Sequence, residues 1–398
     1  SQFPCYDETF ILREIHCLSK RIDVVIFSLR KSKDKIVHNE ASELISKTTY
    51  VPYLFSWKVV KAQIRVFVMQ PFGYLRALFR LVIGNFKSPE FLFKSLAFFP
   101  KSVYLAKWLK EKKVTHIHAH WATYPASVAL TASEISGIPF SFTGHAHDIY
   151  LNATHLREKM MRAAFVVTCT RQNKQHLMKM APSYSGDRVM VSYHGVDLEK
   201  FKVNGKVRND TFQILSVGTL QYHKGFQYLL PALEILKKSG ANFRCTLVGG
   251  GPLESDIRKH IRLLGLESYV AMTGPLKQNE VLQCYRKSDL FILMAQPEWH
   301  WGIPNVLIEA LAAKTPVITT RFGSVEELVQ DGETGLMVPP KDSVILAQTI
   351  DRLYHDHSLR IKLAEAGHRL VLERFDLEKN VQKLSEQFQN YESTALLV

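Results

Sequence analysis

The chain has 398 residues, 46% of them hydrophobic, and a formal net charge of +14. This length exceeds what one hydrophobic core usually serves, so the sequence predicts two folded domains and excludes one long disordered chain. The excess of Lys and Arg favours anionic partners such as phosphates or acidic lipid, whereas nucleic acid is not expected because no recognised nucleic-acid-binding module accompanies the charge.

The cysteines, five in number, are widely spread and form no C-x-x-C pair. Neither a disulfide framework nor a zinc cluster is therefore predicted, and a reducing cytoplasm fits this usage. The sequence shows no apolar stretch long enough to cross a bilayer and no signal peptide. We expect a cytoplasmic protein that is soluble or peripheral at the inner face of the membrane.

Short apolar runs rich in β-forming residues alternate with longer helical patterns along the whole chain. In the first half these runs are Ile22–Phe27, Val114–His118, Pro139–Thr143, Phe165–Thr170 and Val189–Tyr193. In the second half they are Phe212–Val217, Phe243–Val248, Val270–Thr273, Leu290–Met294 and Pro316–Thr319. This alternation is typical of βαβ units around parallel strands, so the predicted fold class is α/β.

A polar, Gly-containing stretch from Phe201 to Asp210 separates the two series of strands. It predicts an N-terminal domain over 1–200 and a C-terminal domain over 201–375, followed by a final helix and tail over 376–398. Ser1 to Pro4 resemble a loop that leaves a strand, so we expect the first strand of the first domain to be truncated.

The segment from Lys58 to Lys113 combines many Lys and Arg residues with large aromatic side chains and contains only Glu90 and Glu111 as acids. A basic amphipathic surface with exposed rings is typical of an interfacial membrane binder, so an anionic membrane surface is an expected partner. The alternative is that the rings form the core of the first domain and the lysines a solvated face.

Histidines mark the probable strand ends of the first domain. His116, His118 and His120 alternate and therefore share one face of a strand, where the lack of a well-placed carboxylate or fourth ligand favours a cleft wall over a metal site. The stretch from Gly144 to Asp148 follows the next strand, and ligand sites in parallel sheets lie beyond such carboxyl ends. His145 or Asp148 is predicted to have a polar or acid/base role; the alternative is a turn whose polar groups satisfy the backbone.

Glycine-rich loops follow the strands of the second domain. Gly218 and Thr219 end one strand, and Lys224–Gly225 precedes a helical pattern, so backbone amides at a helix start plus one Lys predict a phosphate site. Gly249, Gly250 and Gly251 leave the next strand in the same topological position. The G-x-G-x-x-G fingerprint is absent, which argues against a nicotinamide enzyme.

The most informative stretch runs from Trp301 to Leu311, where a Gly-containing turn enters a helix that carries one acid. Exposed amides at such a turn bind a diphosphate or sugar hydroxyls, and Glu309 can accept both hydroxyls of a ribose. The alternative interpretation of Glu309 is an ordinary acid near a helix N-terminus, stabilised by the helix dipole.

At these residues the chain resembles glycosyltransferase family 4, the retaining enzymes of the GT-B fold, and especially its exopolysaccharide and colanic-acid-type members. The ordered matches are Phe3 to Ile15, His118-Ala119-His120-Trp121, Phe142 to Tyr150, His194 to Asp197, Gly302 to Ala310 and Asp331 to Gly335. The resemblance implies two Rossmann-like domains facing across a cleft and a C-terminal helix that crosses back to the first domain.

The resemblance also implies the function and the roles of the site residues. A retaining hexosyltransferase-type enzyme would move a sugar from a nucleotide sugar to a glycan or lipid-linked acceptor in polysaccharide biosynthesis, with no cofactor and no metal. Lys224 would neutralise the diphosphate, Glu309 would hold the ribose, and His145 would lie beside the reacting sugar. The remaining donor-binding residues would be Gly218, Thr219, Gly250, Gly251, Trp301, Gly302, Ile303, Pro304, Asn305 and Val306, and the acceptor-binding residues His118, His120, Trp121, His145 and Asp148.

Two positions depart from the family pattern. Thr219 stands where the family usually has an Arg paired with Lys224, and Trp301 stands where the family usually has the first acid of a Glu-x7-Glu motif. Loss of one electrostatic contact at such a site typically lowers the rate ~10²-fold or more. Glu298, Arg321 and His223 are candidates to compensate for the missing Arg and the missing acid. The alternative function is a catalytically degenerate GT-B protein that binds nucleotide, glycan or a partner.

Overall fold

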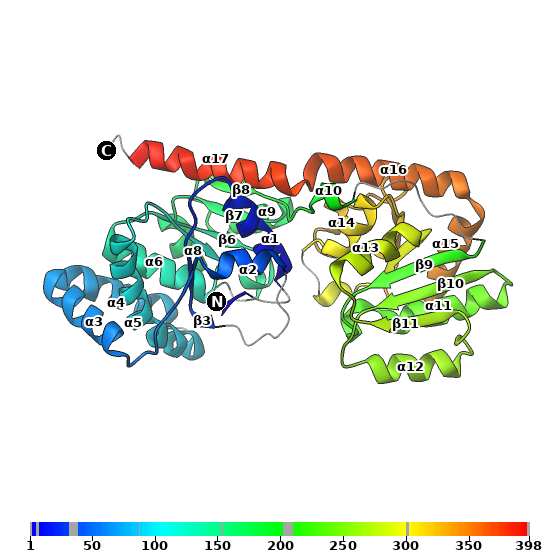
Figure 1. Cartoon of the computed structure of the whole chain (residues 1–398), viewed down its shortest axis with the longest axis horizontal. Coiled ribbons are helices and arrows are strands. Elements are labelled where there is room, and N and C mark those ends of the chain that lie inside the picture. The colour runs from blue at the N-terminus through cyan, green and yellow to red at the C-terminus, as the bar shows by residue number, and fades with distance from the viewer. Residues whose placement is uncertain are drawn as a thin grey trace. The chain divides into compact units, whose positions relative to one another are not determined.

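A computed structural model describes residues 2–4, 8–31, 39–86, 88–151, 153, 155–201, 210–299 and 302–395 (Figure 1). The chain divides into two compact units. Unit 1 comprises Ser1–His194 and Glu378–Val398, and unit 2 comprises Gly195–Leu377. Most of the stretch expected to link the two domains lies outside the described residues.

The main sheet of unit 1 has four parallel strands in the order β5-β6-β7-β8. These are β5 (Ile117–His120), β6 (Phe140–Gly144), β7 (Val166–Thr168) and β8 (Val189–Val191). Two smaller parallel pairs join β2 (Ile26–Ser28) to β4 (Thr48–Tyr50) and β1 (Gln2–Phe3) to β3 (Arg30–Lys31). The strand predicted from Ile22 starts only at Ile26, because Ile22 N still donates to Leu18 O at the end of a helix.

Helices cover both faces of this sheet. They are α1 (Thr9–Leu18), α2 (Asn39–Ile45), α3 (Trp57–Met69), α4 (Pro71–Asn85), α5 (Pro89–Glu111), α6 (Tyr124–Ser136), α7 (His147–Tyr150), α8 (Leu156–Arg162), α9 (Arg171–Met180) and α17 (Leu377–Ala395). Small buried residues such as Ala106 and Ala126 allow α5 and α6 to pack closely in the core. Among the described helices, no single one is long and apolar enough to cross a bilayer; α3 and α4 meet that criterion only together, with a bend of 113° between them.

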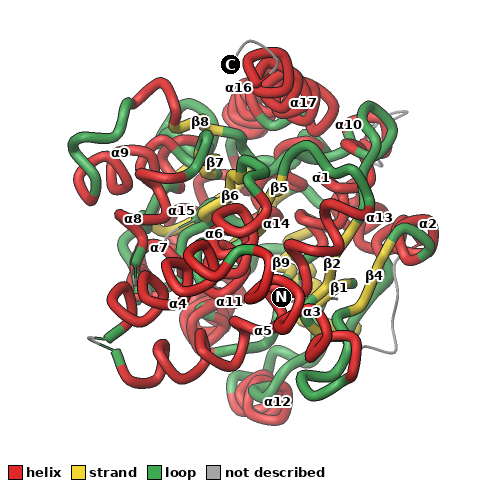
Figure 2. Tube along the Cα trace, turned by 90° about the vertical axis from the view of Figure 1, so that its left-hand side faces the viewer, coloured by secondary structure: helices red, strands yellow, loops and turns green. Residues whose placement is uncertain are grey.

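The final helix packs on the first domain, as the family resemblance implied. Phe388 of α17 makes an edge contact with Phe165, and Arg21 pairs with Glu378 at 2.7 Å. Figure 2 shows α17 lying beside β5 to β8 within this unit.

Unit 2 contains one sheet of six parallel strands in the order β11-β10-β9-β12-β13-β14. The strands are β9 (Phe212–Val217), β10 (Phe243–Val248), β11 (Val270–Gly274), β12 (Leu290–Leu293), β13 (Val317–Thr320) and β14 (Leu336–Val338). The helices are α10 (Leu198–Phe201), α11 (Phe226–Lys238), α12 (Glu254–Leu263), α13 (Gln278–Lys287), α14 (Asn305–Ala312), α15 (Ser343–His355) and α16 (His357–Arg374). Every predicted strand is present. The strand β14 was not predicted from the sequence.

Gly225 fixes the start of α11 against a neighbouring strand. Its φ is 76°, in the left-handed region, and a Cβ added there would lie 1.9 Å from the carbonyl oxygen of Met294. The atom in the way belongs to the backbone at the end of β12, so it cannot rotate aside. Only glycine therefore fits this position without moving one of the two segments.

We predict that Gly225→Ala destabilises unit 2 by about 3 kcal/mol or more, because it adds a backbone clash to an unfavourable φ. Gly240→Ala is the matched control, since Gly240 has φ 83° and nothing within 4 Å of the added Cβ. The control should cost only about 1–2 kcal/mol. Urea unfolding of the two variants measures the difference, and equal costs would contradict the proposed clash.

Candidate functional site

The sheet of unit 2 reverses its winding between β9 and β12. From β9 the chain proceeds outward through β10 to β11 and then returns to place β12 on the other side of β9. Such a switch point separates the loops at the carboxyl ends of the two strands and is where ligands bind in parallel α/β sheets. The loops that meet here are those that follow Val217 and Leu293, and Gln296 N donates to His223 O across them at 2.9 Å.

Lys224 lies in the first of these loops, in the 3-10 turn before α11. Its side chain lies close to the backbone of Gly218. A Cβ atom built on Gly218 would be 3.8 Å from Lys224 Cδ. Burial lowers the pKa of Lys224, an effect that a bound anion would reverse. Thr219 is exposed next to Gly218, so the structure brings Gly218, Thr219 and Lys224 together at the switch point.

The glycines after β10 serve loop packing. A Cβ on Gly249 would lie 1.9 Å from Gly218 O, and a Cβ on Gly251 would lie 2.6 Å from Leu220 O. Leu220 N also donates to Gly250 O at 3.0 Å. We expected these glycines to allow a ligand to approach the backbone. In the structure, it is the neighbouring loop at Gly218 and Leu220 that lies against them.

The turn before α14 places Glu309 on the second turn of that helix. Pro304 occupies the N-cap position and Asn305 begins the helix, which follows the Gly-containing turn as the sequence predicted. Tyr285 of α13 is buried, and its hydroxyl lies 3.2 Å from Val306 O and 3.4 Å from Glu309 Oε2, within reach of both as a donor. Tyr285 thereby orients Glu309. The sequence gave no signal for it, because one Tyr inside a helix forms no pattern.

Gly302 and Ile303 complete the described part of this turn, whereas Trp301 lies outside the described residues. Two of the candidates to compensate for Thr219 and Trp301 have partners in the structure. Glu298 pairs with Lys341 at 2.9 Å, and Arg321 pairs with Glu326 at 3.1 Å. The third candidate, His223, directly precedes Lys224, and burial lowers its pKa.

In unit 1 the residues at the carboxyl ends of four adjacent strands form a histidine-rich cluster. His120, His145, Cys169 and His194 follow or end β5, β6, β7 and β8 in turn. The ring of His145 stacks on those of His120 and His194, with centroids 5.8 and 5.2 Å apart, and Trp121 packs on it at 4.5 Å. The sequence predicted His145 and His120 at this edge and did not predict His194 beside them.

Burial keeps these imidazoles neutral near pH 7. It lowers the pKa of His116 and of His194 to about 4 and that of His120 to about 3, and it holds the pKa values of His118 and His145 well below 6.5. His118 lies 2.7 Å from Ser141 Oγ and 2.9 Å from Thr143 Oγ1, so its two nitrogens are engaged by the sheet. His145 Nδ1 lies 3.3 Å from His194 Nε2.

Asp148 organises the turn that carries His145. Its carboxylate accepts from the backbone amides of Ala122, His145 and Ala146 at 2.6, 2.9 and 3.1 Å. The side chain is buried, so contact with an acceptor would require these bonds to break. This arrangement matches the alternative interpretation, in which the polar groups of the turn satisfy the backbone.

Two further buried residues, which the sequence did not predict, hold the turn that carries His145 and the turn that follows β5. Lys159 of α8 donates to Ala122 O and Thr123 O at 2.7 and 3.1 Å, and burial lowers its pKa to about 7. Asn173 of α9 donates to His145 O. Sequence patterns do not reveal these residues, because their partners are backbone atoms distant in the chain.

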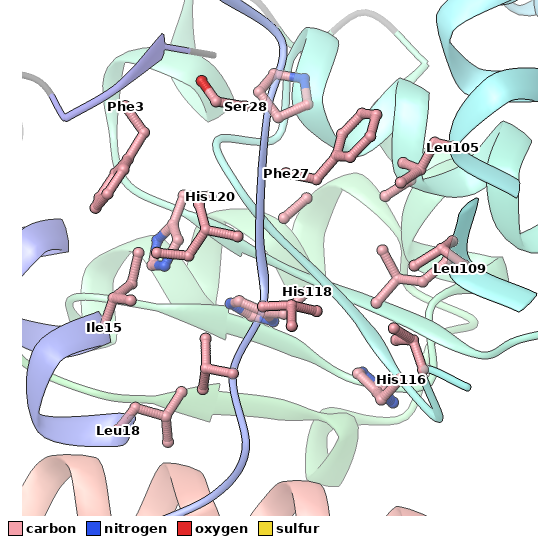
Figure 3. Close-up of a pocket in the computed structure, with 18 of the residues that line it drawn as sticks. Phe3, Ile15, Leu18, Phe27, Ser28, Leu105, Leu109, His116, His118 and His120 are labelled. Atoms are coloured by element: carbon pink, nitrogen blue, oxygen red, sulfur yellow. The ribbon is translucent and has the colours of Figure 1, made fainter. Parts of the chain in front are cut away.

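A cavity of about 580 Å³ adjoins the cluster in unit 1 (Figure 3). Its wall includes His118, His120 and Trp121, the predicted acceptor-binding residues of β5. Consecutive residues of β5 and of β2 line it. Because successive side chains of a strand point to opposite faces of the sheet, the cavity must lie at the edges of these two strands. Phe27, Leu105 and Leu109 contribute apolar side chains to its wall, beside the polar side chains of Ser28 and His116.

Potential metal ligands come together at His145, Cys169 and His194, whose ligand atoms lie within 4.8 Å of one another. This group differs from the alternating histidines that the sequence suggested for a metal. Cys169 Sγ lies 3.0 Å from the carbonyl oxygen of His145, to which it can donate. The three residues therefore have protein partners in this arrangement, and a metal ion would have to displace them.

We predict that acid destabilises unit 1. Between pH 6.5 and about 4 the unfolded chain binds more protons at His116, His120 and His194 than the folded chain does, so the free energy of unfolding falls as the pH falls. Glu14 has the opposite effect on the free energy of unfolding. Burial raises its pKa to about 7, so the folded chain binds more protons at Glu14 than the unfolded chain does, and the contribution of Glu14 to stability is lost as pH rises from about 4.5 to 7.

His116→Asn tests this linkage. It should flatten the pH dependence by up to ~1.4 kcal/mol per pH unit, measured by urea unfolding at pH 5 and pH 7. The control is His355→Asn, because His355 is exposed and lies in unit 2. An unchanged slope in His116→Asn would show that His116 is not buried in its neutral form.

Comparison with known proteins places both units in one group. Residues 8–200 match the sequence model of Glycosyltransferase Family 4, and residues 197–370 match that of Glycosyl transferases group 1. The amylovoran biosynthesis glycosyltransferase AmsK of Erwinia amylovora is 29% identical over 218 residues, 53% of this chain and 53% of that protein. The capsular polysaccharide biosynthesis glycosyltransferase CapM of Staphylococcus aureus is 27% identical over 209 residues, 50% of this chain and 54% of that protein.

Solved structures extend the likeness to the whole chain. A glycosyltransferase from Rickettsia africae superposes with a TM-score of 0.69 at 19% identity, over 98% of this chain and 96% of that chain. Anabaena HepE in complex with UDP and glucose superposes with a TM-score of 0.67 at 18% identity, over 98% and 97%. These likenesses confirm the fold expected from the sequence.

Proposed function

Because the chain belongs to the group 1 glycosyltransferases of family 4, a retaining family, we propose that it moves a hexose from a nucleoside-diphosphate sugar to a glycan or lipid-linked acceptor in the cytoplasm. The product would serve cell-surface polysaccharide synthesis, as the names of AmsK and CapM state for those relatives. The observation that carries the proposal is the position of Lys224 at the switch point of the unit 2 sheet.

Unit 2 is proposed to bind the donor. Lys224 neutralises the diphosphate, and its burial strengthens that contact because the surroundings screen the charge less than water does. Glu309, oriented by Tyr285, accepts the hydroxyls of the ribose. The amides from Ile303 to Val306 at the start of α14 bind phosphate and sugar oxygens, with Gly218, Thr219, Gly250 and Gly251 forming the neighbouring loop walls.

Unit 1 is proposed to bind the acceptor. His145, neutral and packed between Trp121 and His194, offers a hydrogen bond to a sugar hydroxyl without adding a charge. His118, His120 and Trp121 line the adjoining cavity, whose apolar wall suits the lipid part of a lipid-linked acceptor. Asp148 acts through the turn that positions His145.

The proposed chemistry is a front-face displacement. The bond between the anomeric carbon and the diphosphate oxygen breaks through an oxocarbenium-like state, and the acceptor oxygen bonds to the same face while its proton passes to the leaving diphosphate. Stabilising the charge that develops on the leaving group is the main catalytic device, and Lys224 supplies it without a metal.

We predict that UDP raises the thermal stability of the protein, since UDP is the nucleotide bound by HepE in the solved complex. At 100 times its dissociation constant, a ligand stabilises the folded state by ~2.7 kcal/mol. Lys224→Met should weaken nucleotide binding and lower the transfer rate ~10²-fold or more, because it removes the charge while keeping the length of the side chain. Thermal shifts with UDP, GDP and ADP measure the binding.

Two variants serve as controls for this prediction. Lys238→Met, at the far end of α11, removes an exposed charge from the helix that follows Lys224 and should leave binding unchanged. His145→Asn should leave the nucleotide shift intact while lowering transfer, because it lies in the other unit. Absence of a shift with any nucleoside diphosphate would contradict the proposed donor site.

We also predict that Thr219→Arg tightens nucleoside-diphosphate binding. Thr219 is exposed beside Gly218 and Lys224, so an Arg there adds a second cation to the phosphate site. The matched control is Gln221→Arg in the same loop. Equal nucleotide affinity in the wild type and in Thr219→Arg, measured by calorimetry, would show that position 219 does not reach the diphosphate.

A further inference from the structure

The basic aromatic segment predicted from the sequence divides into a buried and an exposed part. Phe99, Val103 and Trp108 of α5 are buried in the core of unit 1, as the alternative interpretation expected. The rings before them are different. Every exposed Phe and Trp in the part of the chain that the structure describes lies between residues 53 and 96.

These side chains lie on the loop before α3 and on α3, α4 and α5, and we refer to them together as the α3–α5 surface. Its exposed Phe and Trp side chains include Phe55 (89% exposed), Trp57 (74%), Phe72 (87%), Phe79 (65%) and Phe93 (77%). The three helices pack on one another within unit 1 and lie at its left end in Figure 1.

Helix α4 has two apolar faces. Ala77 and Leu81 are buried and belong to the core of unit 1. Phe72, Leu75 and Phe79 follow one another at intervals of three and four residues, so they form a second stripe, and that stripe is exposed. A surface helix of a soluble monomer normally carries polar residues on this side, so the second stripe needs an apolar partner.

Positive charge accompanies the exposed rings. Lys58, Lys61 and Arg65 of α3 and Arg76 of α4 are exposed, and neither helix contains an Asp or a Glu. Arg80 pairs with Glu134, and Lys94 pairs with Glu90, so these two charges are partly neutralised. The remaining charge favours an anionic surface over a neutral one.

The geometry of α3 and α4 fits a flat partner. The two helices meet at Gln70 with a bend of 113°, and side chains on both sides of the bend, including Val68, Met69 and Phe72, are exposed. A bent pair with apolar residues around its corner can insert that corner to a shallow depth while the flanking cations meet lipid headgroups.

We propose that the α3–α5 surface docks this protein on an anionic lipid bilayer, with its aromatic side chains in the headgroup zone and Lys58, Lys61, Arg65 and Arg76 against acidic lipids. If two copies of the chain associated through this surface, the positive charges of one copy would face those of the other. This repulsion opposes self-association. The proposal does not depend on nucleotide binding, because none of these residues lies in unit 2.

Co-sedimentation of the full chain with vesicles tests the proposal. With vesicles of equal parts phosphatidylglycerol and phosphatidylcholine we expect binding, and with pure phosphatidylcholine we expect binding at least tenfold weaker. The triple variant Phe72→Ser, Leu75→Ser, Phe79→Ser should lose at least tenfold in the partition coefficient. The variant Lys61→Gln, Arg65→Gln should lose roughly tenfold or more, and this loss should shrink at high salt.

A matched control separates insertion from a general loss of apolar surface. Leu263→Ser, Val344→Ser, Ile361→Ser removes three exposed apolar side chains from unit 2 and should bind vesicles as the wild type does. Tryptophan fluorescence should shift to the blue on vesicle binding, and Trp57→Phe should abolish most of this shift, because Trp57 lies in the docking surface.

Three results would overturn the proposal. The first is no binding of the wild type to anionic vesicles at low salt, and the second is an equal loss of binding in the Phe72 and Leu263 triples. The third is a wild type that forms dimers and does not bind vesicles, with the dimers lost in the Phe72 triple. The last result would assign the surface to a second copy of the chain. An unchanged circular dichroism spectrum and an unchanged urea-unfolding midpoint show that the Phe72 triple is folded. The UDP-induced thermal shift reports separately on the donor site in unit 2, so failure to dock is distinguishable from failure of the donor site.

Discussion

The loops of unit 2 depend on a backbone contact that leaves no room for a side chain, in which the α-carbon of Gly225 faces the carbonyl oxygen of Met294. This contact brings the start of α11 to the end of β12 at the switch point of the sheet. Lys224 is the residue immediately before it, so the same contact directs the Lys side chain along Gly218. Gly249 and Gly251 add further backbone contacts between the loops. The proposed phosphate site would therefore be rigid before any ligand arrives, which would lower the entropic cost of binding.

The site in unit 1 differs from that in unit 2 in its charge. Its histidines lie at the carboxyl ends of parallel strands, and burial holds them in the neutral form. A neutral imidazole is a hydrogen-bonding group, whereas the buried Lys224 is a cation that a diphosphate would stabilise. The hydrogen bonds of Asp148 and Asn173 to the backbone fix the turn of His145, and those of Lys159 hold the neighbouring turn at Ala122 and Thr123. In the proposed function, acceptor recognition and leaving-group stabilisation therefore belong to separate units with separate chemistry.

The α3–α5 surface adds a third physical element, because it places apolar and cationic side chains together in water. Within unit 1, α5 links this surface to the interior: its first half carries Phe93 outward, while Phe99 and Trp108 enter the core. One helix therefore couples the surface to the packing of the sheet that carries the histidine cluster. A lipid-linked acceptor and a membrane-docked enzyme would be mutually consistent, since both would be confined to one interface.

The sequence by itself determined the α/β class, the two series of strands, the helix after the turn at Gly302 and the positions of Lys224 and His145 beyond strand ends, because these features depend on local periodicity, turn chemistry and short motifs. Only the tertiary structure decided which glycines serve packing between loops, that Tyr285 orients Glu309, that Asp148 is bound by three amides and that half of the aromatic segment is exposed. These facts depend on contacts between residues far apart in the chain, and a hydrophobic pattern does not reveal whether an apolar face meets the core or the solvent.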